Sequence, residues 1–234
     1  MFLRFADSVP KRRGPERNED AAGGHPYRGI YAMSDGASES YAPALWARLV
    51  TKRFLTNQRV DAAWLRAACG LFASHFDRES MSWSAQAAYD RGSFATLLGL
   101  RFSGAGRRAE VLAIGDSLAV LADGEAVIDS FPYAEADEFR QNPLLISTLM
   151  ERNADVQNRL LSGSGHRCWD LSSFPNPRIL CMTDALGAWL LDNREERLPV
   201  LLSLRTKLQF RSLVDAERAA GRLRRDDTTL LVFQ

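Results

Sequence analysis

The sequence predicts a layered α+β protein, in which strands and helices do not alternate in regular βα units. Short apolar runs follow one another between residues 93 and 131, with turn signals between them. Further strand-like runs lie near both ends of the chain, at residues 2–9 and 228–233, and amphipathic helix patterns lie between them. Clustered strands of this kind favour an α+β architecture over a doubly wound sheet. A length of 234 residues fits a single domain, residues 1–234.

The N-terminal third predicts two strands and two helices. Residues 2–9 predict a strand, and the polar stretch after them, punctuated by Gly and Pro, predicts a loop. An apolar run at residues 29–34 predicts the second strand. Apolar residues recur along 42–54 at the spacing of one helix face. A similar stripe at 64–76 follows Asp61, which is a good N-cap candidate.

The pattern of the remaining residues predicts a strand meander, followed by a segment that is first acidic and then helical. Strands are expected over residues 93–103, 107–115, 118–123 and 125–131, with a tight hairpin at Asp123-Gly124. The segment 134–165 begins with an acidic run and is expected to be helical over 144–161. Beyond it the pattern predicts a strand, two helices and a buried final strand, over residues 178–183, 186–191, 208–223 and 228–233.

Composition excludes several classes of protein. With 30 Lys and Arg against 29 Asp and Glu, the net charge is +1, which argues against nucleic acid or an anionic membrane as a partner. Cys69, Cys168 and Cys181 lack the spacing of a disulfide framework or a zinc finger, and favour a reducing cytoplasm. No run reaches the ~18 apolar residues of a membrane span, and the first residues lack the apolar core of a signal peptide. We therefore expect a soluble, cytoplasmic protein.

Some conspicuous residues are expected to be structural. Trp46 and Trp64 lie on the apolar helix stripes and are predicted to be core residues. Cys181 has no candidate base around it and is predicted to be a buried strand residue. The three histidines lie far apart without metal-type spacing, at His25, His75 and His166.

Acidic residues recur where predicted strands end. Three apolar runs lead directly into an aspartate followed by a small residue, at Asp35-Gly36, Asp116-Ser117 and Asp184-Ala185. Two further acidic pairs are Glu19-Asp20 in the first loop and Asp226-Asp227 before the last strand. Any one of them is most simply a turn residue, because an Asp side chain bonds the backbone two residues on. Loops at strand ends also carry functional groups, so a shared site is the alternative.

Convergence of these carboxylates would require that some of them are protonated or that cations lie among them. Two carboxylates ~4 Å apart repel by about 4 kcal/mol at an effective dielectric constant near 20. Oxygen ligands suit Mg²⁺ and Mn²⁺, whereas the absence of Cys/His ligand spacing disfavours zinc. Two such cations activate a water and hold a phosphoryl group. Spacing alone leaves convergence open.

The order of six short motifs resembles the metal-dependent protein phosphatase family (protein phosphatase 2C), bacterial type. The motifs are Asn18-Glu19-Asp20-Ala21, Ser34-Asp35-Gly36, Ser93-Phe94-Ala95-Thr96, Gly115-Asp116-Ser117, Thr183-Asp184-Ala185 and Asp226-Asp227-Thr228-Thr229. They lie between residues 18 and 233, nearly the whole chain. The resemblance implies a four-layer α-β-β-α sandwich, in which two antiparallel sheets pack face to face between helices and carry the site at one end.

The same resemblance implies a binuclear Mn²⁺ or Mg²⁺ centre with a weaker third metal. Asp35 would bridge the two metals, and Gly36 would offer its backbone carbonyl to one of them. The other implied ligands are Asp20, Asp184, Asp226 and, for the third metal, Asp116. Glu19 would not bind a metal itself but would orient the waters that are bound to the metals. The implied reaction is hydrolysis of phosphoserine or phosphothreonine in a protein, the product of a Ser/Thr kinase, by attack of a metal-bridging water.

Three positions depart from the family pattern. Pro15 stands where the family usually has an arginine for the substrate phosphate, so Arg13 or Arg17 is the candidate substitute. Residues 37–40 replace the segment in which the animal enzymes carry a histidine. Ala185 stands where Gly is usual.

These departures leave two other functions open. Pro15 and the unusual 37–40 loop favour a catalytically weak member that binds phosphoproteins or a regulatory partner. A phosphatase of small phosphorylated metabolites would use the same centre. The 134–165 segment lies where family members carry a variable flap, which the acidic residues 134–138 are expected to form. The basic runs 11–13 and 222–225 predict solvated faces, with attraction of a phosphorylated substrate as the alternative.

Overall fold

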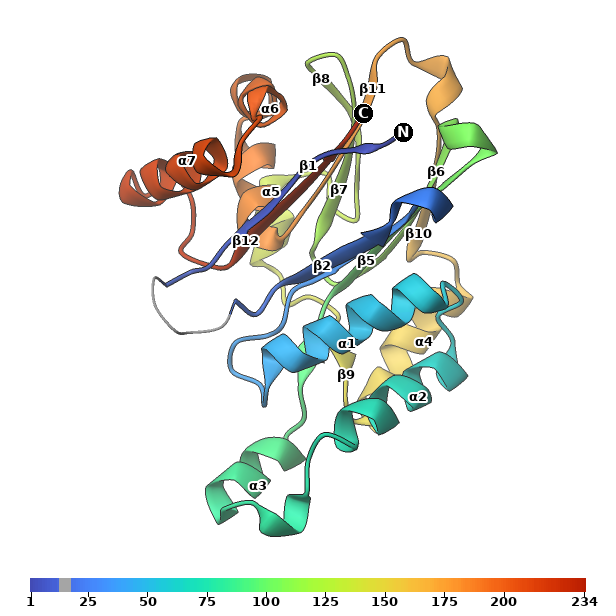
Figure 1. The fold of residues 1–234 in the computed structure, drawn as a ribbon, viewed down its shortest axis with the longest axis vertical. Helices are drawn as coiled ribbons and strands as arrows, with labels where there is room; N and C mark the ends of the chain where they lie inside the picture. Colours follow the sequence, from blue (N-terminus) through green and yellow to red (C-terminus); the bar gives the residue numbers. More distant parts are fainter. Residues whose placement is uncertain (13–17) are drawn as a thin grey trace.

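Two five-stranded antiparallel sheets lie face to face in the computed structural model, which describes residues 1–12 and 18–234 (Figure 1). The first sheet has the spatial order β1 (Leu3–Val9), β12 (Thr228–Phe233), β11 (Pro177–Met182), β7 (Leu118–Asp123) and β8 (Ala126–Phe131). The second has the order β10 (His166–Asp170), β6 (Arg108–Ile114), β5 (Leu97–Ser103), β3 (Ile30–Ser34) and β2 (Ala21–His25). A short ribbon pairs β4 (Phe94–Ala95) with β9 (Ile146–Ser147).

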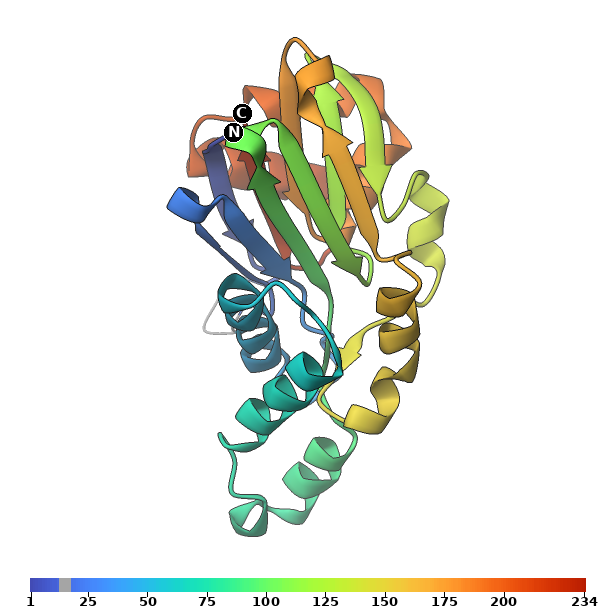
Figure 2. The same cartoon turned by 90° about the vertical axis from the view of Figure 1, so that its right-hand side faces the viewer.

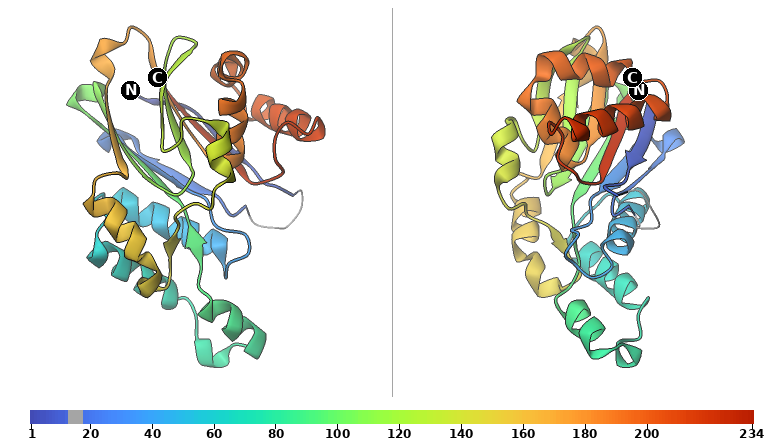
Figure 3. Two further views of the ribbon diagram at one scale, coloured as in Figure 1. Left: turned by 180° about the vertical axis from the view of Figure 1, so that it is seen from behind. Right: turned by 90° about the vertical axis from the view of Figure 1, so that its left-hand side faces the viewer.

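Helices form the two outer layers. The first sheet is covered by α5 (Asp184–Asp192), α6 (Arg194–Ser203) and α7 (Lys207–Ala219), as Figure 3 shows. The second is covered by α1 (Pro43–Thr56), α2 (Ala62–Ala73) and α4 (Ala154–Leu161), while α3 (Trp83–Asp90) extends past the end of the sandwich (Figure 2). The predicted four-layer α-β-β-α architecture is confirmed. None of the described helices has the length and apolar character needed to cross a bilayer.

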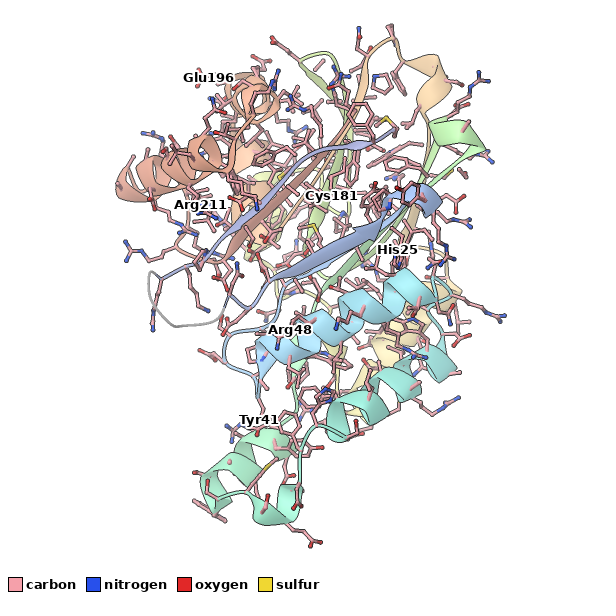
Figure 4. The ribbon with its side chains drawn as sticks, viewed as in Figure 1. His25, Tyr41, Arg48, Cys181, Glu196 and Arg211 are labelled. Atoms are coloured by element: carbon pink, nitrogen blue, oxygen red, sulfur yellow. The ribbon has the colours of Figure 1, made fainter. Side chains whose placement is uncertain are left out.

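Three apolar clusters fill the three interfaces between layers. Along β11, Ile179 and Cys181 face the other sheet while Leu180 and Met182 face the helices, because strand side chains alternate between faces. Cys181 is 2% exposed and lies between the sheets, which confirms its predicted burial (Figure 4). The two helix-stripe tryptophans are also buried as predicted, and both belong to the cluster under α1 and α2: Trp46 and Trp64.

Local turn and cap signals are confirmed where they were strongest. β7 and β8 form the hairpin expected at Asp123-Gly124, and Gly124 adopts a left-handed φ of 58° that favours glycine. The Asp61 carboxylate accepts the Trp64 amide at 2.9 Å and caps α2.

The helix expected over residues 144–161 is wrong in its first half. Residues 146–147 form β9, a 3₁₀ turn spans 150–153, and only α4 is α-helical. The buried side chain of Asn153 explains the difference. Its Oδ1 accepts the backbone N–H of Ser147 and its Nδ2 donates to the Ser147 carbonyl, at 2.9 Å each. Side-chain bonds of this kind compete with the helix backbone for the same groups.

Other elements escaped the sequence analysis or differ in extent. Besides β9, two strands were missed, and both are edges of the second sheet: β2 and β10. One side of an edge strand pairs with no other described strand, and apolar alternation is not required there. Two helices were missed: α3, and α6, which contains Pro199. The run at 93–103 is divided between β4 and β5, and the helix expected over 208–223 ends at Ala219.

A pair of glycine substitutions tests the packing of α1 on the second sheet. A Cβ on Gly99 of β5 would lie 2.2 Å from the Phe54 ring, whereas a Cβ on Gly70 of α2 would meet no atom of the described residues within 4 Å. We expect Gly99→Ala to lower the free energy of unfolding by about 1–3 kcal/mol and Gly70→Ala to raise it by about 0.5–1 kcal/mol. Urea unfolding measures both, and equal effects would contradict this packing.

Candidate metal centre

Four aspartates from the ends and starts of strands meet at one end of the sandwich. Asp35 follows β3, Asp116 lies in the β6–β7 turn, Asp184 begins α5, and Asp226 precedes β12. All four line a cavity of about 130 Å³. The remaining lining residues are Gly36, Ala37, Ser38, Thr96, Pro143 and Leu145. The convergence that spacing alone left open is therefore present in the fold.

Thr96 fixes the end of β3 that carries Asp35. The Asp35 amide donates to the Thr96 hydroxyl, and the Thr96 amide donates back to the Asp35 carbonyl, both at 2.9 Å. The Thr96 and Ser117 hydroxyls are 2.8 Å apart, which ties the β3 end to the β6–β7 turn. The Ser-Phe-Ala-Thr and Gly-Asp-Ser motifs thus hold two of the aspartates in register.

Glycines at two positions permit this close approach. A Cβ on Gly36 would lie 2.6 Å from the Pro43 carbonyl oxygen, and the Gly36 amide donates to the Glu19 carbonyl at 3.2 Å. Gly115 has a φ of 98°, and a Cβ there would lie 2.6 Å from the Thr96 methyl carbon. Only glycine fits both positions without displacing the loops.

Asp20 is close enough to raise the pKa of Asp35, although it is not among the residues that line the cavity. Its Oδ2 accepts the hydroxyls of Thr229 at 2.5 Å and Thr183 at 3.2 Å. Its Oδ1 is buried and has no hydrogen-bond partner among the described residues. Because an unpartnered buried oxygen is costly, this atom fits a role as a ligand or as an acceptor for a bound water.

Burial and mutual repulsion raise the pKa of the carboxyl groups. Burial raises the pKa of Asp20 to about 8, and the Asp227 and Asp184 charges act in the same direction, against the two threonine hydroxyls. Burial raises the pKa of Asp35 well above its usual range, reinforced by the other acids of the cluster. Burial, together with the charge of Asp184, raises the pKa of Asp116 to about 7 and also raises the pKa of Asp226. A cluster of this kind favours protons or bound cations.

The donor set fits a hard divalent cation. Four carboxylates and a glycine backbone line this small cavity, and oxygen donors of this kind are what Mg²⁺ and Mn²⁺ prefer. In the conformation described for residues 1–12 and 18–234, no group of three His, Cys, Asp or Glu side chains is arranged to hold one ion. Binding one ion through three of these carboxylates would therefore require the side chains to rearrange.

An arginine that the sequence analysis placed on a solvated face contacts this cluster. The Arg224 guanidinium donates to the Asp184 carboxylate, and its Nη2 lies 3.4 Å from Asp226 Oδ2. The Arg224 side chain is 55% exposed, as expected of a solvated face, but its contact with the cluster was not predicted. Arg222 of the same run is also 55% exposed and pairs with Glu217 at 2.6 Å. The only sequence signal was the position of Arg224, two residues before Asp226.

Asp227 anchors the first loop and does not line the cavity. It is 2% exposed, and its two oxygens accept the backbone amides of Lys11 at 2.6 Å and Glu19 at 2.7 Å. The second acid of the Asp-Asp pair therefore positions the chain that carries Glu19 and Asp20.

Glu19 is held beside the Asp35-Gly36 loop. Its Oε2 accepts the Lys11 ammonium at 2.5 Å and the Ser38 hydroxyl at 2.7 Å. Lys11 also donates to Ser38 at 2.6 Å, so the divergent 37–40 loop supplies a contact to Glu19. This lysine was another member of a basic run predicted to be solvated, and that prediction is wrong for Lys11.

The remaining predicted site residues divide into two groups. Arg13 and Arg17, with Pro15, lie outside the described residues. Within the 134–165 segment, Pro143 and Leu145 reach the cavity, whereas the acidic run forms a 3₁₀ turn whose Glu135 pairs with Arg194 at 2.9 Å.

Solved structures share this architecture over nearly the whole chain. The serine/threonine phosphatase PstP/Ppp of Mycobacterium tuberculosis matches with a TM-score of 0.63 and 17% identity, over 99% of this chain and 98% of that one. The PstP catalytic domain in complex with 2 manganese ions matches with a TM-score of 0.59 and 19% identity, over 98% and 96%. Phosphatase Stp1 of Staphylococcus aureus matches with a TM-score of 0.59 and 12% identity, over 99% and 96%.

The chain therefore has the fold of the protein phosphatase 2C-type serine/threonine phosphatases. The resemblance drawn from the six motifs is confirmed at the level of the fold. No family model matches the chain, and no curated protein matches it.

Proposed function

We propose that this chain is a metal-dependent phosphoprotein phosphatase that hydrolyses phosphoserine and phosphothreonine. The observation that carries the proposal is the convergence of Asp35, Asp116, Asp184 and Asp226 on one cavity at the end of the sandwich. The likeness in fold to serine/threonine phosphatases supports it, and one of those structures contains manganese. Mn²⁺ or Mg²⁺ is the proposed cofactor.

The carboxylates have separable roles in this proposal. The two main cations would be held by the carboxylates of Asp35, Asp184 and Asp226. Asp20 and the Gly36 carbonyl would add further ligands, and Asp116 would bind the weaker third metal. The bound cations would supply an acidified water and charge stabilisation for the phosphoryl oxygens. Thr96 anchors the Asp35 backbone through two hydrogen bonds, which would fix the point at the end of β3 from which this carboxylate extends. The phosphate-binding arginine remains a prediction for Arg13 or Arg17.

Phosphate release from a phosphothreonine peptide tests the proposal. We expect turnover with Mn²⁺, loss of turnover with excess chelator, and slower turnover of a small phosphate ester. Hydrolysis of the small ester alone would favour a phosphatase of small metabolites. The absence of metal-dependent release from both substrates would contradict the proposed activity.

A phosphoprotein-binding module without turnover is the second candidate function. It is favoured by the Arg224 contacts with Asp184 and Asp226, which place a side-chain cation in the proposed metal centre. Retained peptide binding without phosphate release, with Mn²⁺ present, would identify this function.

Glu19→Gln tests whether Glu19 orients the metal-bound waters without binding a metal itself. Gln keeps the size of the side chain but removes the charge that Lys11 and Ser38 hold in place. We expect turnover to fall by about 10–100-fold, since groups that orient ligands typically contribute this much. Steady-state kinetics measures the change, and a loss below about twofold would exclude this role.

A further inference from the structure

Arg224 occupies a position in which it meets the same carboxylate oxygens that a metal would need. Its guanidinium is shared between Asp184 and Asp226, which come from different elements of the fold. Among the ion pairs of the described residues, none involves Asp20, Asp35 or Asp116. The positive charge therefore sits on one side of the cluster and leaves the Asp35 side without a cationic partner.

A guanidinium and a divalent cation are alternatives at this pair. Both neutralise carboxylates, and the Arg224 N–H groups and a bound cation would draw on the same small set of oxygen lone pairs of Asp184 and Asp226. The pair is also unequal in exposure, since the Asp184 side chain is 13% exposed and the Arg224 side chain is 55% exposed. The arginine can therefore leave into solvent, whereas Asp184 cannot.

The backbone around Arg224 is anchored, so exchange needs only a side-chain movement. Leu223 is 4% exposed and packs in the core under the helices, and Asp227 is 2% exposed. Arg218 of α7 donates to the Asp226 carbonyl and, at 2.9 Å, to the Thr228 hydroxyl. With both flanks fixed, the long side chain of Arg224 is the part free to move.

We propose that Arg224 is a built-in competitor of the metal ion, holding Asp184 and Asp226 together in the metal-free protein and turning out when a divalent cation binds. The proposal rests on the metal centre of the proposed function. It predicts that the affinity for metal is set by how readily this guanidinium is displaced, as well as by the ligands.

Calorimetric titration of the metal-free chain with Mn²⁺ tests the competition. Arg224→Gln removes the competing charge, and Arg225→Gln is the matched control, since Arg225 is the exposed neighbour and its loss changes the net charge equally. We expect Arg224→Gln to bind Mn²⁺ at least about tenfold more tightly than wild type, a factor that corresponds to about 1.4 kcal/mol. Arg225→Gln should stay within about twofold of wild type.

Thermal unfolding provides a second readout that needs no turnover. Because a ligand stabilises only the state that binds it, Mn²⁺ should raise the Tm of Arg224→Gln more than that of wild type or Arg225→Gln at the same concentration. Equal Mn²⁺ affinities in all three proteins would overturn the competition and leave the metal centre intact. A lack of Mn²⁺ binding in all three would overturn the metal centre, and the competition with it.

Discussion

Asp35→Asn should reduce metal-dependent phosphate release on the order of 10³-fold or more. Asp35 is the cavity-lining aspartate whose backbone is locked on both sides by Thr96, and it has no ion pair to a described residue. Asn keeps the shape but loses the negative charge and one cation-binding oxygen. Steady-state hydrolysis of a phosphothreonine peptide measures the loss, which combines weaker metal binding with lost stabilisation of the transition state.

Asp123→Asn is the matched control for this substitution. Asp123 also ends a strand and precedes a glycine, but it lies in the β7–β8 hairpin, where its carboxylate accepts the Asn176 amide at 2.7 Å. We expect activity within about twofold of wild type. Loss of activity in both variants, or retention of a tenth or more of wild-type activity in Asp35→Asn, would contradict the assignment of Asp35.

The second large effect is a fall in the stability of the metal-free protein as pH rises. The pKa of Asp20 is raised to about 8 and that of Asp116 to about 7 in the folded chain, against an ordinary value near 4 when unfolded. Between these values the folded state retains protons that the unfolded state has lost. The free energy of unfolding therefore decreases with pH across this window.

Urea unfolding in chelator at pH 5 and pH 8 measures this effect. We expect the free energy of unfolding to fall by at least about 1.4 kcal/mol, the equivalent of one pKa unit. Asp20→Asn should flatten the dependence because the amide does not titrate in this range. With Mn²⁺ the direction should reverse, since deprotonated carboxylates bind the ion. A metal-free stability that rises from pH 5 to pH 8 would contradict the raised pKa values.

Sequence reasoning predicted the interior of the fold better than its edges. The central strands β11 and β12 are buried on both faces, so they appear as continuous apolar runs. The edge strand β2 reads Ala-Ala-Gly-Gly-His and carries no such pattern. Residues 144–153 were misjudged because one buried side chain, Asn153, organises their backbone through bonds that periodicity does not encode.

The candidate site, too, was predicted from the sequence only in part. The strand–Asp–small recurrence identified Asp35, Asp116 and Asp184, and the structure brings them to one cavity with Asp226. The contacts of Arg224 with Asp184 and of Lys11 with Glu19 were not predicted, because both residues belong to basic runs and these partners lie 40 and 8 positions away in the chain. The specific role of each ligand remains a proposal that rests on the family resemblance.

Crystals of the chain soaked in Mn²⁺ would test the central claim most directly, through the anomalous scattering of manganese. The account predicts anomalous peaks within the cavity lined by Asp35, Asp184 and Asp226, with the Arg224 guanidinium turned away from Asp184. Well-diffracting soaked crystals without a peak in this cavity, with Arg224 still bound to Asp184, would contradict the assignment of these aspartates as a metal centre.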